Sequence, residues 1–230
     1  MKTIGLIGGM SWESTVSYYR IINTKVKEGL GGLHSAKCVL CSVDFAEIEA
    51  LQRQGDWRGI GQALADAARA LEKAGADFGL ICTNTMHEVF GQVQGAVSMP
   101  FLHIAEATAQ AVLERGVTRV GLLGTAHTME QDFYKDKLRR AGIEVLIPGP
   151  EERAEISRVI YEELCLGQIL APSRAYYLRA VEGLAARGAQ GVIMGCTEIG
   201  LLLNGEKTSV PLFDTAEIHA AGAAALALAG

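Results

Sequence analysis

Ile4–Gly8 (IGLIG) is repeated 116 residues later as Val120–Gly124 (VGLLG). Two further pairs recur in the same order: GLICT at 79–83 with IMGCT at 193–197, and PFLHIAE at 100–106 with PLFDTAE at 211–217. Single matches of this kind arise by chance, because apolar strands that end in glycine are common. Three ordered matches at offsets of 116, 114 and 111 residues predict an internal duplication.

Short apolar runs alternate with longer helical patterns, which is typical of a parallel α/β fold. The expected strands are Thr3–Ile7, Cys38–Val43, Phe78–Ile81, Met99–His103, Arg119–Leu123, Glu144–Ile147, Gly191–Met194 and Val210–Phe213. The pattern also predicts a helix over Trp57–Lys73. We therefore expect two pseudo-symmetric parallel-sheet α/β domains, 1–116 and 117–230. The C-terminal segment could cross back to the first domain.

Composition excludes several classes of protein. The chain has 230 residues, of which 49% are hydrophobic and 20% charged, as in a globular protein. Its net charge of −5 disfavours a nucleic-acid partner. No apolar run is long enough to cross a bilayer, and the N-terminal apolar run is too short for a signal peptide. We expect a cytoplasmic protein with reduced cysteines.

Two of the five cysteines occupy equivalent places in the repeat. Cys82 and Cys196 each follow an apolar strand and precede a helical segment, where ligand sites gather in open α/β sheets. Asn84 and Thr197 are expected to cap those helices, whose N-termini would favour the thiolate. A site in a cleft between the domains would then hold one thiol on each side. Two such acid/base groups can invert a stereocentre, one removing a proton from one face and the other delivering a proton to the opposite face.

Other candidate residues have simpler interpretations. Cys38 and Cys41 form a CxxC, but no second pair completes a zinc site, so they are expected to be ordinary strand residues. His87 and His103 lack the spacing of metal ligands, and we expect them to cap or to lie at the edge of the core. Glu198 fits two roles equally, an ordinary first-turn acid or a partner of Cys196 and of a substrate ammonium. No metal site is predicted.

Three motifs together resemble the aspartate/glutamate racemase family: IGLIGGMSWEST at 4–15, CTNTMH at 82–87 and GCTE at 195–198. The resemblance covers essentially the whole chain. It implies a cofactor-independent amino-acid racemase, commonly a homodimer, that acts on a small amino acid. It also implies Cys82 and Cys196 as the two acid/base residues. The same resemblance assigns substrate contacts to Met10, Gln52, Thr83, Asn84, Thr85 and Thr197.

The chain departs from that family at two places. Family members devoted to aspartate carry basic residues after the second strand and before a later glycine turn. Here those segments read DFAE at 44–47 and EELCLG at 162–167, so broader or neutral specificity is plausible. Gln52 and Cys165 could line the side-chain pocket instead. Two alternatives stay open: a related cysteine-dependent isomerase or decarboxylase of small carboxylic acids, and a non-catalytic amino-acid-binding clamshell.

Overall fold

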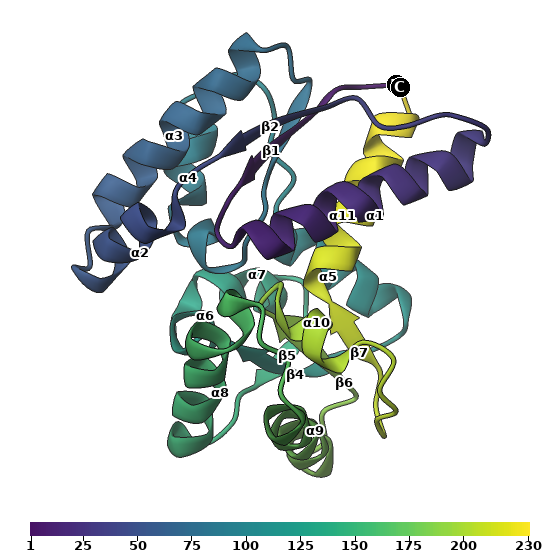
Figure 1. Ribbon diagram of the computed structural model, residues 1–230. Coiled ribbons are helices and arrows are strands. Elements are labelled where there is room, and N and C mark those ends of the chain that lie inside the picture. The colour runs from purple at the N-terminus through teal and green to yellow at the C-terminus, as the bar shows by residue number, and fades with distance from the viewer. The chain divides into compact units, whose positions relative to one another are not determined.

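The computed structural model describes residues 1–230, and the chain folds as two compact units. The first contains residues 1–104 and 219–230, and the second contains residues 105–218. Each unit is built on one parallel sheet flanked by helices (Figure 1). The division of the sequence into repeated halves, 1–116 and 117–230, stays a prediction. No helix of the chain combines the length and the apolar character needed to cross a membrane.

The sheet of the first unit has the strand order β2-β1-β3. Its strands are β1 (Ile4–Gly8), β2 (Cys38–Ser42) and β3 (Phe78–Ile81). Its helices are α1 (Trp12–Leu30), α2 (Phe45–Arg53), α3 (Trp57–Lys73), the 3-10 helix η1 (Thr85–Val89) and α4 (Phe90–Gly95). The central strand β1 is buried along its whole length, as expected for a strand covered on both faces.

The sheet of the second unit has the strand order β5-β4-β6-β7. Its strands are β4 (Arg119–Gly124), β5 (Glu144–Leu146), β6 (Gly191–Gly195) and β7 (Leu212–Asp214). Its helices are α5 (Ile104–Glu114), α6 (Ala126–Glu130), α7 (Asp132–Arg140), α8 (Pro150–Glu162), the 3-10 helix η2 (Leu164–Leu166), α9 (Ala171–Ala186) and α10 (Ile199–Leu203). The last helix, α11 (Thr215–Leu228), begins in this unit and ends in the first. The two repeated glycine-rich strands, β1 and β4, thus hold equivalent central places in their sheets.

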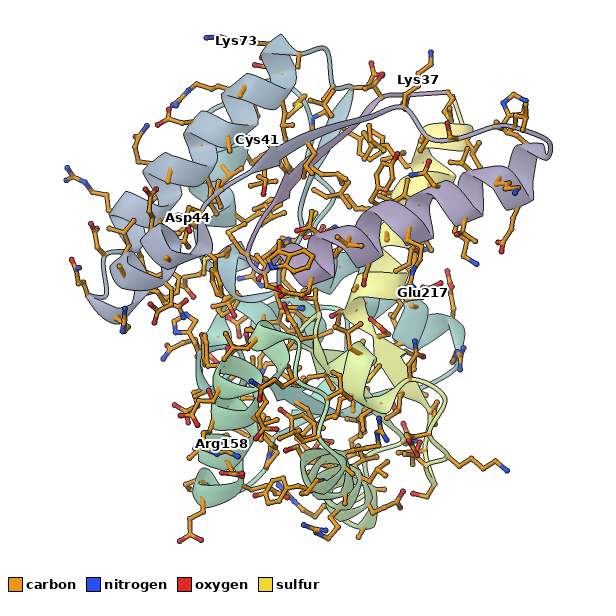
Figure 2. The ribbon with its side chains drawn as sticks, viewed as in Figure 1. Lys37, Cys41, Asp44, Lys73, Arg158 and Glu217 are labelled. Carbon is orange, nitrogen blue, oxygen red and sulfur yellow. The ribbon has the colours of Figure 1, made fainter.

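The predicted helix over Trp57–Lys73 is confirmed with these bounds. Asp56 begins α3, because its carboxylate accepts the Gly59 N–H at 2.9 Å. The predicted apolar stripe is buried in the core of the first unit: Ile60, Leu64, Ala67, Ala68 and Leu71. Asp44, labelled in Figure 2, starts the preceding helix α2 in the same way by accepting the Ala46 N–H at 3.0 Å.

The predicted strand Met99–His103 is wrong. This segment forms only an isolated bridge, in which Phe101 pairs with Gly79 of β3. The aromatic ring of Phe101 occupies the space that a Cβ at Gly79 would need, 2.5 Å from the ring. Phe213 of β7 lies in the same way over Gly191, 2.6 Å from a Cβ there, but in the second unit the pairing continues as a strand. The two units thus use the same glycine–phenylalanine contact at the same edge of the sheet.

His219 ties α11 to the first unit through both ring nitrogens. Nε2 lies 2.9 Å from the Leu102 carbonyl oxygen and must donate to it, so Nδ1 accepts the Tyr18 hydroxyl, also at 2.9 Å. The ring is completely buried. Burial lowers the pKa of His219 from 6.5 to about 3, with a smaller contribution from His103, so the ring is neutral in the folded protein.

This histidine makes stability depend on pH. Between pH 6.5 and 3 the unfolded chain holds a proton on His219 that the folded chain does not, so the free energy of unfolding falls as the pH falls. We expect a loss of roughly 3 kcal/mol from this group between pH 7 and pH 4. Urea unfolding at pH 7, 5.5 and 4 measures it. His219→Gln, which keeps a donor and an acceptor, should show a shallower fall, and an equally steep fall would contradict the assignment.

Candidate functional site

The first candidate site lies at the carboxyl end of the first sheet. Met10 follows β1 and Cys82 follows β3, and these strands are neighbours in parallel register. The Cys82 N–H donates to the Ile7 carbonyl at 2.9 Å, so the backbone of Cys82 is anchored to β1. Both side chains are buried. Gly9, between β1 and Met10, has φ = +94° and lies against the Val43 carbonyl, so no larger residue fits this turn.

Cys82 is only 1% exposed, and burial raises the pKa of its thiol far above 9.0, with a further contribution from Cys38. The raised pKa runs against the expectation that a helix N-terminus favours the Cys82 thiolate. The segment that follows is the short 3-10 helix η1, and the side chain of Asn84 makes no capping hydrogen bond to it.

The other residues predicted in this unit lie on two neighbouring segments. Thr83, Asn84 and Thr85 directly follow Cys82 and are buried. Gln52 is half-buried in the last turn of α2, on the segment that follows β2, the other neighbour of β1. The structure therefore gathers Met10 and Cys82–Thr85 at the ends of paired strands, and it places Gln52 on a separate helix of the same unit.

The second candidate site lies at the carboxyl end of β6. The Cys196 thiol donates to Oε2 of Glu198 at 3.0 Å, and the Thr197 hydroxyl donates to the same oxygen at 2.8 Å. Glu198 is only 2% exposed. Thr197 does not cap the following helix as expected, because Glu198 holds the position before α10 and Thr197 is engaged with the Glu198 carboxylate. Of the two roles left open for Glu198, the geometry favours a partner of Cys196.

The pKa of Cys196 is also raised well above 9.0. Burial is the main cause, and the negative charge of Glu198 and the neighbouring Cys165 add to it. Cys165 is half-buried in η2 and belongs to the surroundings of Cys196, as does Tyr177 of α9, whose pKa both cysteines raise further. Burial thus favours the neutral thiol at both repeated cysteines.

One more buried carboxylate lies beside η2. Glu163 accepts the Ser173 hydroxyl at 2.5 Å and pairs with Arg158, labelled on α8 in Figure 2, at 3.0 Å. The Tyr177 hydroxyl donates to the Ile156 carbonyl at 2.7 Å and so fastens α9 to α8. Sequence reasoning missed this arrangement, because nothing in the pattern distinguishes Glu163 from its neighbour Glu162.

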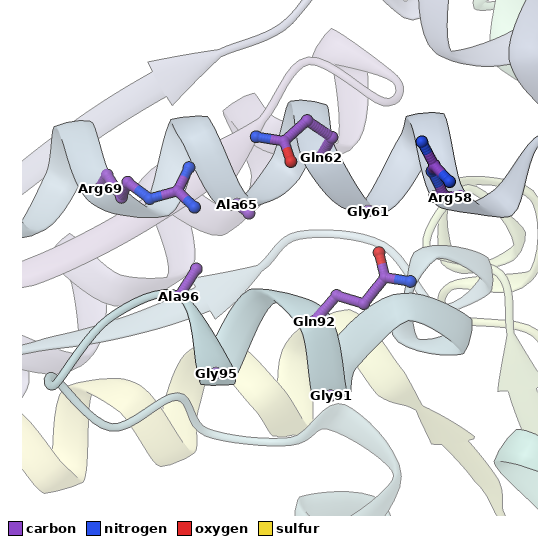
Figure 3. A pocket seen from close by; sticks show the side chains of 9 residues that line it. All are labelled: Arg58, Gly61, Gln62, Ala65, Arg69, Gly91, Gln92, Gly95 and Ala96. Carbon is purple, nitrogen blue, oxygen red and sulfur yellow. The ribbon is translucent and has the colours of Figure 1, made fainter.

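The remaining candidates carry no comparable chemistry. None of the five cysteines forms a disulfide, and the chain has no group of three histidine, cysteine or carboxylate side chains that could hold a metal ion. A hollow between α3 and α4 is lined by glycines, alanines and the two glutamines Gln62 and Gln92, with Arg58 and Arg69 along its α3 side (Figure 3). Arg69 pairs there with Asp66 at 2.5 Å. This hollow has no acid or base suited to proton transfer at carbon.

Both candidate thiols lie in a stretch of the chain that matches a known protein family. The model of the Asp/Glu/Hydantoin racemase family matches residues 7–223. The chain belongs to the Asp/Glu/Hydantoin racemase family. Both candidate cysteines and all the predicted substrate contacts lie within the matched residues, so the sequence resemblance to aspartate/glutamate racemases is confirmed.

Solved structures of family members share the fold over the whole chain. A protein from Yersinia pestis, solved as a candidate Asp/Glu racemase, is 55% identical and covers 99% of this chain and 100% of its own, with a TM-score of 0.92. An aspartate racemase homologue from Pyrococcus horikoshii is 38% identical over 99% of this chain and 100% of its own, with a TM-score of 0.84. These likenesses confirm the predicted two-sheet α/β fold.

A curated relative has a named activity. The broad specificity amino-acid racemase RacX of Bacillus subtilis is 27% identical over 158 residues. The alignment covers 67% of this chain and 66% of RacX, so it spans slightly less than two thirds of that protein.

Proposed function

We propose that the protein is an amino-acid racemase that needs no cofactor and uses Cys82 and Cys196 as its two acid/base groups. The observation that carries the proposal is the equivalence of the two thiols. Each directly follows a strand that pairs with the central glycine-rich strand of its own sheet, in a chain of the racemase family. Nothing in a single-thiol reaction or in a binding protein requires this equivalence.

In the proposed reaction, one cysteine acts as a thiolate and removes the α-proton from one face of the substrate carbon. The other acts as a thiol and delivers a proton to the opposite face. In the reverse direction the two exchange roles. The carbanion-like state between these steps needs hydrogen-bond donors, and Thr83, Asn84, Thr85 and Thr197 are the donors we assign to it. Met10 and Gln52 are assigned to substrate contact.

Glu198 is the group that we propose converts Cys196 to a thiolate. Its carboxylate accepts a hydrogen bond from the Cys196 thiol, with Oε2 3.0 Å from Sγ. Transfer along this hydrogen bond yields the thiolate and a neutral Glu198. The raised pKa of Cys196 makes deprotonation of its thiol unfavourable. A substrate ammonium bound nearby reduces this free-energy cost, because a positive charge favours the thiolate.

The side chain of the substrate is the least constrained part of the proposal. The segments at 44–47 and 162–167 offer no lysine or arginine for a second carboxylate, and Cys165 is half-buried close to Cys196. We therefore propose broad or neutral specificity, with Cys165 near the substrate side chain. The named activity of RacX is of this kind. A homodimer stays a prediction of the resemblance, and a cytoplasmic location stays a prediction from composition and cysteine usage.

The test is direct. The purified protein should convert single L-amino acids into mixtures with their D-forms without added cofactor, as measured by chiral chromatography over a panel of neutral, basic and acidic amino acids. We expect neutral or basic members to be racemised at least as fast as aspartate and glutamate. Binding of these amino acids by calorimetry with no racemisation of any of them would contradict the proposal and favour the binding protein.

A further inference from the structure

Three histidines lie together in the first unit. His87, His103 and His219 are at most 4% exposed. The ring centroid of His87 lies 4.6 Å from that of His103 and 6.0 Å from that of His219. Burying a histidine lowers the stability of the fold unless both ring nitrogens form hydrogen bonds, so the partners of these rings show what the cluster does.

His87 is held in a single tautomer by two backbone groups. Its Nε2 accepts the Ile104 N–H at 3.2 Å, so Nδ1 must carry the proton and donates it to the Thr83 carbonyl at 2.8 Å. Burial and the neighbouring His103 and His219 lower the pKa of His87 well below 6.5. The neutral ring therefore links the Thr83 carbonyl to the Ile104 N–H. It also stacks on Phe90, with the ring centroids 5.7 Å apart.

The Thr83 carbonyl that His87 binds belongs to the residue directly after Cys82, the proposed catalytic thiol. On its N-terminal side, Cys82 is anchored by its own N–H to the Ile7 carbonyl of β1. On its C-terminal side, His87 holds the carbonyl of the next residue, Thr83, which lies one peptide unit beyond the carbonyl of Cys82 itself. The two hydrogen bonds flank the residue and restrict the direction in which its side chain leaves the backbone.

We propose that His87 is a positioning residue for the Cys82 thiol. This inference rests on the proposed function, because the position of the Cys82 thiol affects the rate only if Cys82 transfers protons. His87 itself touches neither the thiol nor the substrate in this account. A displacement of about 1 Å in a reacting group can cost on the order of 100-fold in rate. Loss of the two His87 hydrogen bonds should therefore slow proton transfer at Cys82 although the thiol is still present.

The experiment compares His87→Leu with His87→Gln, using the amino acid that the protein racemises fastest. Gln can donate to Thr83 and accept from Ile104, whereas Leu can do neither. We expect His87→Leu to lower kcat by at least about 30-fold and His87→Gln by less than about 10-fold, because only the Leu variant releases both backbone groups and lets the reacting thiol shift. His34→Leu, at an exposed loop histidine, should match the unmodified protein.

Kinetic isotope effects separate positioning from a merely structural role. With α-deuterated L- and D-substrates, slowing the Cys82 step should raise the isotope effect for the enantiomer that Cys82 deprotonates and lower it toward 1 for the other. Glu198→Gln, which slows the Cys196 step, should give the opposite asymmetry. Partial unfolding lowers both rates equally and leaves both isotope effects unchanged.

Unchanged isotope effects in a folded His87→Leu protein would overturn the inference, and so would the same asymmetry in the two variants. If His87→Leu does not fold, His87→Asn replaces it, since the shorter amide keeps the buried polarity but cannot span both partners. It must show the same asymmetry. Failure of the unmodified protein to racemise any amino acid would instead refute the proposed function.

Discussion

Cys82→Ser and Cys196→Ser should each lower racemisation by at least about 100-fold while leaving the protein folded. General acid–base catalysis typically contributes about 10² to 10⁴-fold, and a serine hydroxyl is far too weak an acid to replace a thiol in this step. Serine is nearly isosteric with cysteine, so the buried surroundings of Cys82 and Cys196 should survive. The measurement is the initial rate in both directions by chiral chromatography, with the melting temperature as a check of folding.

Cys41→Ser is the matched control for these variants. Cys41 lies on β2, packs against the core of the first unit and has no assigned role in proton transfer. It should retain the rate of the unmodified protein within about twofold. A fully active Cys82→Ser or Cys196→Ser protein would reject the assignment of that thiol.

Glu198→Gln should lower kcat on the order of 100-fold, because glutamine can accept a hydrogen bond from the Cys196 thiol but cannot take its proton. It should also move the rising limb of the kcat/KM profile to higher pH. With Glu198 present, the Cys196 proton passes to the carboxylate. In the variant that proton must be lost to solvent, and burial, the main cause of the raised pKa of Cys196, remains. Rate profiles between pH 6 and pH 10 measure both effects.

Glu206→Gln controls for the loss of a carboxylate near α10. Glu206 is half-exposed and pairs with Arg174 at 3.5 Å, so its removal should leave kcat and the pH profile unchanged. If Glu198→Gln retained the full kcat, Glu198 would have no part in activating Cys196. A shift of the rising limb to lower pH would mean that Glu198 opposes thiolate formation and would contradict its role as the proton acceptor.

Much of the fold could be predicted because its signals are local. The α3 stripe follows helical periodicity with an aspartate cap before it, and both bounds are correct. The segment Met99–His103 has the composition of a strand, but whether it continues as one depends on how many residues find partners. Only Phe101 does so, over Gly79, and no local pattern reports that number.

The positions of the two repeated cysteines in the fold could be predicted, but their electrostatics could not. The repeat placed Cys82 and Cys196 after equivalent strands, and the structure has both there. The raised pKa values of the two thiols could not be predicted, because the depth of burial that causes them is a tertiary property. The contacts of His87 and His219 join segments 17 and 117 residues apart, a separation that one sequence does not reveal.

Deuterium uptake from D₂O tests the central claim most directly. Starting from one pure enantiomer and stopping the reaction early, the two forms are separated and the deuterium at the α-carbon of each is measured by mass spectrometry. If separate thiols serve the two faces, the product carries solvent deuterium while the remaining substrate carries almost none. Equal early labelling of substrate and product would mean that one base serves both faces, and the two-thiol mechanism would be contradicted.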